Sequence, residues 1–72
     1  MINTKEIKKL LIDKDLKIHD VAKCINKSYS NTLLKINGKY SLTLSEAESI
    51  QFLLDIDDCD FCYYFLSREN SL

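Results

Sequence analysis

The sequence predicts an all-α fold of five short helices, and three observations support this prediction. The chain has 72 residues with no proline and one glycine, and tight β-hairpins depend on residues that tolerate positive φ, so strands are hard to place. Apolar residues recur at spacings of three and four, which is the period of an amphipathic helix. Asn, Ser, Thr or Asp precedes most of these stretches, as expected of helix N-caps. A chain of this length is expected to form one domain, residues 1–72.

The first helix is expected to begin after Asn3, which stands three positions before Glu6, as in a capping box. Ile7 and the two leucines at positions 10 and 11 form its apolar stripe. The helix is expected to end near Lys14-Asp15. Its lysines then lie on the wet side, where a solvated face is the ordinary explanation.

The central stretch, residues 21–38, predicts two short helices joined by a tight turn. The apolar spacing places them at Ile18 to Ile25 and at Tyr29 to Ile36. Two helices that cross steeply through a three-residue turn need a small side chain where their backbones approach, and Ala22 provides it.

The ends of these two helices carry their own signals. Asn26 is expected to adopt a left-handed conformation, because asparagine tolerates it better than any residue except glycine. Ser28 is a natural N-cap for the second helix of the pair. Gly38, the only glycine, is expected to end that helix in the left-handed C′ position.

The remaining helices are predicted from two further caps. Thr43-x-x-Glu46 forms a capping box that opens the fourth helix, and Asp57 is expected to cap the last one. Residues 67–72 are expected to be a frayed tail. The inward faces of these two helices are predicted to consist of Leu44, Ala47, Ile50, Leu53, Leu54, Cys62, Phe65 and Leu66.

The three cysteines, Cys24, Cys59 and Cys62, are expected to be reduced thiols in a cytoplasmic protein, since their number is odd and no signal peptide is evident. Cys59-x-x-Cys62 has no second cysteine pair to complete a zinc site, and His19 is the only histidine. The two cysteines are therefore predicted to pack near core aromatic side chains, with no metal and no cofactor. The longest apolar run, Phe61 to Leu66, is too short to span a bilayer.

Charge is distributed unevenly along the chain. The net charge is −1, but the first 40 residues hold nine lysines against four acidic residues, a net of +5. The remaining residues hold one arginine against seven acidic residues, a net of −6. Phosphate attraction depends on the local basic patch more than on the sum, so this asymmetry admits nucleic acid as a partner.

No arrangement in the sequence predicts an enzyme. His19 has no evident carboxylate and nucleophile partners, and no glycine-rich loop is present to cradle a phosphate. The adjacent carboxylates Asp57-Asp58 are sufficiently explained as residues that favour a helix start.

The pattern L-x-x-x-D-V-A-x-x-I-N-x-S-Y-S-N-T-x-x-x-I-N-G-K, followed by L-T-L-S-E-A-E-x-I, resembles the lambda repressor and Cro-like (XRE) family of helix-turn-helix regulators of phages. The resemblance covers residues 4–66. It implies a five-helix fold whose third helix enters the major groove of double-stranded DNA. It also implies a sequence-specific transcription regulator, of repressor type, that binds as a homodimer.

Residue by residue, the resemblance implies two sets of DNA contacts. The base-reading positions correspond to Tyr29, Ser30, Asn31 and Leu34. The backbone-contact positions correspond to Lys17, His19, Lys27, Lys35, Asn37 and Lys39. The third helix departs from the family pattern by lacking an arginine, which would make the strongest guanine contact.

Two features keep other partners open. Leu33 and Leu34 stand where polar base readers are common, so the same fold could serve as a protein-binding module, such as a phage antirepressor or an inhibitor of a host protein. The run Phe61 to Leu66 is more apolar than one core stripe can bury. Tyr63 and Tyr64 are therefore candidates for a homodimer contact, the alternative being that they lie over a neighbouring helix with their hydroxyls in water.

Overall fold

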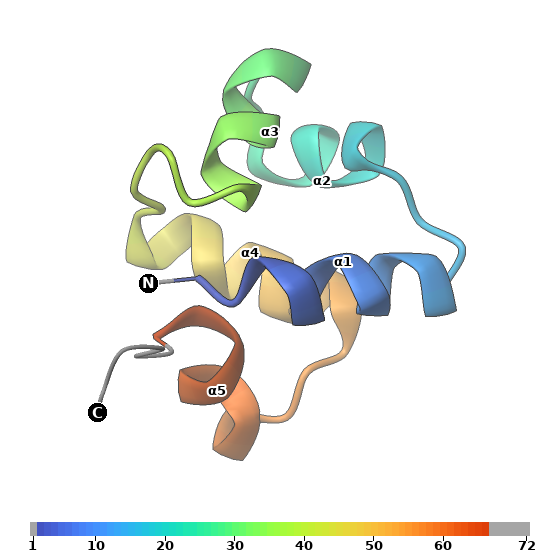
Figure 1. Ribbon diagram of the computed structural model, residues 1–72, viewed down its shortest axis with the longest axis vertical. Coiled ribbons are helices and arrows are strands. Elements are labelled where there is room, and N and C mark those ends of the chain that lie inside the picture. The colour runs from blue at the N-terminus through green and yellow to red at the C-terminus, as the bar shows by residue number, and fades with distance from the viewer. Residues whose placement is uncertain (1, 67–72) are drawn as a thin grey trace.

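The computed structural model describes residues 2–66, and these residues form five α-helices and one 3₁₀ turn, with no strand. The predicted all-α fold with five helices is therefore confirmed at this level. Figure 1 shows α2 and α3 together at one end of the molecule, α1 and α4 crossing in the middle, and α5 at the other end. The predicted tail at 67–72 lies outside the described residues. The elements are α1 Thr4–Asp13, α2 Ile18–Ile25, α3 Tyr29–Ile36, α4 Leu44–Leu54, η1 Asp58–Asp60 and α5 Phe61–Phe65.

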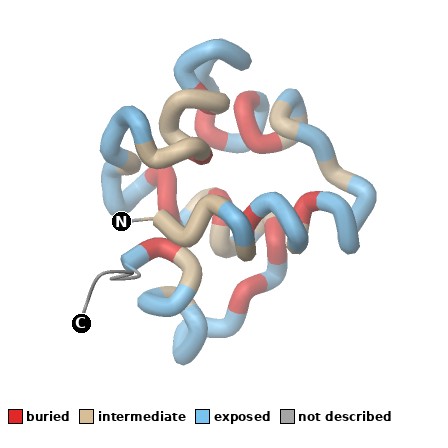
Figure 2. The backbone as a smooth tube through the Cα atoms, viewed as in Figure 1, coloured by how far each residue is buried: buried red, intermediate tan, exposed pale blue. Residues whose placement is uncertain are grey.

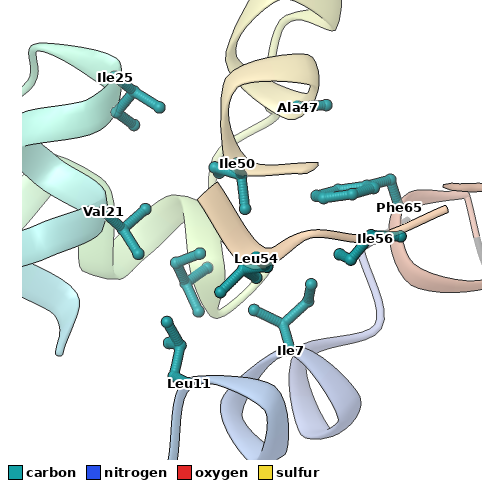
Figure 3. Close-up of a cluster of buried hydrophobic side chains, with 10 residues drawn as sticks. Ile7, Leu11, Val21, Ile25, Ala47, Ile50, Leu54, Ile56 and Phe65 are labelled. Carbon is teal, nitrogen blue, oxygen red and sulfur yellow. The ribbon is translucent and has the colours of Figure 1, made fainter. Parts of the chain in front are cut away.

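The core lies where α1 and α4 cross, and every α-helix contributes to it (Figure 3). Ile7, Ile36, Ile50 and Leu54 have no exposed surface. Figure 2 shows the buried segments facing this centre, with exposed backbone on the outside of each helix. Each fully buried aliphatic side chain stabilises the fold by about 1.5–3 kcal/mol, so these contacts fix the positions of the helices. The buried cluster consists of Ile7, Leu11, Val21, Ile25, Ile36, Ala47, Ile50, Leu54, Ile56 and Phe65.

Four helices end in the same way, with one left-handed residue and a hydrogen bond that closes the last turn. Asn26 (φ 58°) and Gly38 (φ 80°) adopt the predicted left-handed conformation. Asp15 (φ 57°) and Asp55 (φ 56°) do the same after α1 and α4. These two were not predicted, because an aspartate at a helix C-terminus opposes the helix dipole and is a weak stop signal. In each case the next N–H donates to a carbonyl five residues back, as in a Schellman motif: Leu16 to Leu11, Lys27 to Ala22, Lys39 to Leu34 and Ile56 to Gln51.

The predicted N-caps are confirmed for α3 and α4 but not for α1. The Ser28 hydroxyl accepts a hydrogen bond from the Asn31 N–H over 3.2 Å. Thr43 and Glu46 exchange both bonds of a capping box, at 3.1 and 3.0 Å. α1 begins directly after Asn3 as predicted, but the predicted side-chain cap is wrong, since the Asn3 side chain makes no cap bond. The Asn3 side-chain amide instead donates to the Tyr63 carbonyl over 3.5 Å, and the Asn3 backbone N–H donates to the Tyr64 carbonyl over 2.8 Å. Long-range pairing with α5 has thus replaced the local cap.

The C-terminal segment differs most from its prediction. Asp57 makes no side-chain cap, and the expected single helix is divided into η1 and α5. A 3₁₀ turn advances its side chains by about 120° per residue instead of about 100°, which rotates the predicted inward face. Phe65 is buried as predicted, but Cys59 and Cys62 are exposed and the predicted packing of both is wrong. Leu66 and Leu44, also predicted inward, are 56% and 67% exposed.

Candidate nucleic-acid interface

Helices α2 and α3 form a compact pair connected by the three residues 26–28 (Figure 1). Their bounds coincide with the predicted ones. Ala22 is 7% exposed, in agreement with its predicted place where the helices approach. The left-handed backbone at Asn26 reverses the chain, and Ser28 starts the next helix immediately. The sequence thus determines locally how α3 projects from α2.

Hydrogen bonds fix this pair on the rest of the molecule. The Cys24 thiol on α2 donates to the Ser49 carbonyl on α4 over 3.3 Å. The Thr4 hydroxyl on α1 donates to the Ile36 carbonyl at the end of α3 over 2.6 Å. Neither bond was predicted, because a hydroxyl or thiol gives no signal of a partner 25 or 32 residues away.

The first turn of α3 is the exposed part of that helix. Tyr29, Ser30 and Asn31 are all exposed, with Tyr29 at 43%. The backbone N–H of Asn31 is occupied by Ser28, but within residues 2–66 no hydrogen bond uses the side chains of these three residues. The predicted base-reading triplet therefore lies together on one accessible turn, and its donors and acceptors face outward.

A histidine from α2 extends this surface. The rings of His19 and Tyr29 stack with centroids 4.6 Å apart and an interplanar angle of 38°. The first turns of α2 and α3 therefore present one continuous patch. Lys17 precedes α2 and is exposed, while the Asp20 carboxylate is occupied by accepting the Lys17 N–H over 2.8 Å.

Lysines border this patch in the turn before α3 and in the loop after it. Lys27 is exposed in the turn, and Lys39 is exposed directly after Gly38. Asn37 is half-buried as the residue that ends α3. In the described part of the chain, none of Lys17, Lys27 and Lys39 forms an ion pair, so their ammonium groups are available to an anion.

Lys35 differs from these lysines, and its predicted contact with the DNA backbone does not fit the structure. Its ammonium lies 2.7 and 2.8 Å from the two carboxylate oxygens of Glu46 on α4. The side chains are only 13% and 8% exposed. A charge held this closely by a buried partner is not free to contact a phosphate, since leaving would strand the carboxylate.

Glu46 both caps the start of α4 and forms an ion pair with Lys35. Burial on its own would raise the pKa of Glu46, but hydrogen bonds from Lys35 and from the Thr43 N–H, with the Lys35 charge, outweigh it and hold the pKa below its ordinary value. The capping box predicted Glu46 as a helix-start residue. It did not predict the ion pair, which joins the end of α3 to the start of α4.

The residues predicted to contact a protein partner or a second copy differ in their exposure. Leu33 and Leu34 are half-buried on α3, so each keeps some surface free. Tyr63 is 54% exposed, whereas Tyr64 packs against the core cluster. Burial raises the pKa of the Tyr64 hydroxyl, and the Asp60 carboxylate adds to this shift. The predicted dimer pair is therefore divided, with Tyr63 outside and Tyr64 largely within the fold.

Two further findings bear on the chemistry of the chain. Asp57, Cys59 and Asp60 bring ligand atoms within 4.8 Å of one another, but all three are exposed, and such clusters are common without an ion. Within residues 2–66 no helix is both long and apolar enough to cross a membrane.

Comparison of the chain with protein-family models, with curated proteins and with solved structures gave no match.

Proposed function

We propose that this protein is a DNA-binding regulator of the lambda repressor and Cro-like helix-turn-helix type, with the first turn of α3 in the major groove. The observation that carries the proposal is the exposed polar turn Tyr29–Asn31, bordered by unpaired lysines. A major groove about 12 Å wide admits one helix, and base edges are read by side chains at its start.

Each side chain of the patch has a distinct role in this proposal. The Asn31 amide pairs with an adenine edge through a donor and an acceptor, and Ser30 and Tyr29 hydrogen-bond to neighbouring bases or phosphates. Leu34, half-exposed one turn later, contacts a thymine methyl. The phosphate contacts are made by Lys17, His19, Lys27, Asn37 and Lys39, without Lys35.

A regulator of this kind binds its operator as a homodimer. Two copies related by a two-fold axis present their α3 helices to major grooves about one helical turn apart. Tyr63, which is exposed on α5, is the proposed contact. The acidic C-terminal half then faces away from the duplex.

The decisive experiment is selection of binding sites from random duplex DNA, followed by fluorescence anisotropy on the enriched sequence. The logarithm of affinity should fall linearly with the logarithm of salt concentration, with a slope of about −0.9 per phosphate contacted. Lys39→Ala should reduce the magnitude of that slope by about one unit. Lys9→Ala is the matched control, because Lys9 lies on α1 and pairs with Glu6 over 3.6 Å. Failure to enrich any sequence at low salt would overturn the proposal.

The alternative function, a module that binds another protein, is favoured by one observation. Leu33 and Leu34 are adjacent and half-exposed on α3, where apolar surface contributes more to a protein contact than to reading bases. Replacing both by alanine distinguishes the two functions. Loss of a captured protein with unchanged DNA binding supports the alternative, whereas loss of DNA affinity alone supports the regulator.

A further inference from the structure

The two most exposed large apolar side chains in residues 2–66 are Phe52 on α4, at 89%, and Ile12 on α1, at 77%. Neither is part of the proposed DNA surface. Single exposed apolar residues are ordinary on protein surfaces. These two differ because exposed charges of one sign precede each of them on its own helix, basic before Ile12 and acidic before Phe52.

The row on α4 is acidic. Glu48 lies one turn before Phe52 on the same face of α4, and Asp55, the left-handed residue directly after the helix, borders the same hollow. Asp58 extends the row, because the Gln51 amide bonds both its carboxylate, over 2.7 Å, and the Ile56 carbonyl, over 3.0 Å. These residues line a groove of about 520 Å³.

The row on α1 is basic. Lys5, Lys8 and Ile12 recur at the spacing of one helix face, and both lysines are exposed. Neither forms an ion pair with the described residues, in contrast to Lys9, which pairs with Glu6. The row on α1 therefore carries charges of the sign opposite to those of the row on α4, with Ile12 at its C-terminal end, before Asp15.

These two faces cannot meet within one molecule. Ile7 and Leu11 of α1 face Ile50 and Leu54 of α4 across the core (Figure 3), so the rows on both helices turn away from each other. Figure 1 shows α1 passing in front of α4, and Ile12 on α1 and Phe52 on α4 are both exposed. A second copy of the chain can supply the complementary face.

We propose that the protein associates head to tail, with the α1 row of one copy (Lys5, Lys8, Ile12) seated on the α4 row of the next (Glu48, Phe52, Asp55). Phe52 then packs against Ile12 and the alkyl stems of the lysines, while the ammonium groups meet the carboxylates. Because the contact uses two different faces, it propagates from copy to copy, unlike a two-fold contact at Tyr63. It does not depend on DNA binding.

The strength of this contact follows from its size. A single helix pair buries less than the roughly 1,200 Å² of a standard interface, so association is weak and depends on protein concentration. Its charges lie at the surface, where roughly 0.5 M salt screens them far more than roughly 0.02 M salt. The proposal therefore predicts assemblies larger than dimers at low salt, which salt dissociates.

The test is sedimentation velocity of the full chain over a range of concentrations at both salt levels. The average mass of the wild type should rise beyond that of a dimer at low salt and fall at high salt. Lys8→Glu should reduce the association at least tenfold, whereas Lys23→Glu, the same change on the exposed side of α2, should leave it unaltered. Phe52→Ser should weaken association without lowering the helix content measured by circular dichroism.

A second, independent test exchanges the charges of the two rows. One variant carries Lys5→Glu with Lys8→Glu, and the other carries Ser45→Lys, Glu48→Lys and Asp55→Asn. All five positions are exposed, and asparagine retains the left-handed backbone at position 55. Neither variant should associate alone, and an equimolar mixture should. A wild type that remains a monomer or dimer at every concentration, or a mixture that does not associate, overturns the proposal.

Discussion

The first and second turns of α3 differ in what their side chains contact. Tyr29, Ser30 and Asn31 are exposed, and their side chains form no hydrogen bond to the described chain. In the following turn, Thr32 and Ile36 are fully buried and Lys35 is held by Glu46. The helix is therefore anchored by its C-terminal half, and its N-terminal half is exposed.

This difference also separates the environments of two lysines near the end of α3. Lys35 and Lys39 were both predicted to contact the DNA backbone. One turn of helix places Lys35 beside the start of α4, whereas Gly38 turns the chain outward before Lys39. Sequence position alone does not distinguish an exposed lysine from one that holds two helices together.

Breaking the ion pair between Lys35 and Glu46, which anchors α3 to α4, should have the largest effect on stability. Glu46→Gln keeps the bond to the Thr43 N–H but removes the charge that holds Lys35. We expect the free energy of unfolding to fall by about 2–3 kcal/mol, somewhat less than for a completely buried pair, because the two side chains are 13% and 8% exposed. Urea denaturation measures this loss. Adding Lys35→Met to Glu46→Gln should restore most of the lost stability. If Glu46→Gln alone is as stable as the wild type, the anchoring role is contradicted.

Changing the exposed turn should affect binding and leave stability nearly unaltered. Asn31→Ala removes an amide, while the backbone N–H capped by Ser28 remains. We expect a loss of about 1–3 kcal/mol in binding of the selected DNA and a relaxed preference at one base pair. Anisotropy gives the affinity and thermal unfolding the stability. An equal loss for the control Ser45→Ala, exposed on α4, would argue against base reading by Asn31.

Thr32, between the first and second turns of α3, carries a buried hydroxyl without a hydrogen-bond partner among the described residues. The residue is fully buried. Valine has nearly the same shape without the hydroxyl, so Thr32→Val should raise the free energy of unfolding by about 1 kcal/mol. Thermal unfolding tests this. Thr32→Ser, which keeps the hydroxyl and loses the methyl, should destabilise, and the opposite order would mean that the hydroxyl is satisfied.

The smallest expected effect is the acid sensitivity of the anchor. The pKa of Glu46 is lower in the folded chain than its reference value of 4.5, so the carboxylate stabilises the fold above that pH. This contribution disappears as the pH falls through the lowered pKa. The stability difference between wild type and Glu46→Gln should therefore shrink at acid pH. Urea denaturation between roughly pH 6 and pH 3 follows this change, and a constant difference would contradict it.

The sequence predicted the α2–α3 pair closely because its signals are local. Ala22, Asn26, Ser28 and Gly38 act within a few residues of themselves, through side-chain size, tolerance of positive φ or a cap. The same kind of reasoning failed for Asn3 and Asp57. A side-chain cap there competes with other hydrogen bonds, such as that from the Asn3 side-chain amide to the Tyr63 carbonyl.

Taken by itself, the sequence determined the helical class, the bounds of α2 and α3 and the polar character of the turn that starts α3. These depend on apolar periodicity and on the conformational preferences of single residues, which act over short stretches of chain. Only the tertiary structure decided that Lys35 holds Glu46, that the end of α3 is fixed by Thr4, and that Cys59 and Cys62 face solvent. The physical reason is that these outcomes depend on how helices distant in sequence pack together, and residue spacing carries no record of that arrangement.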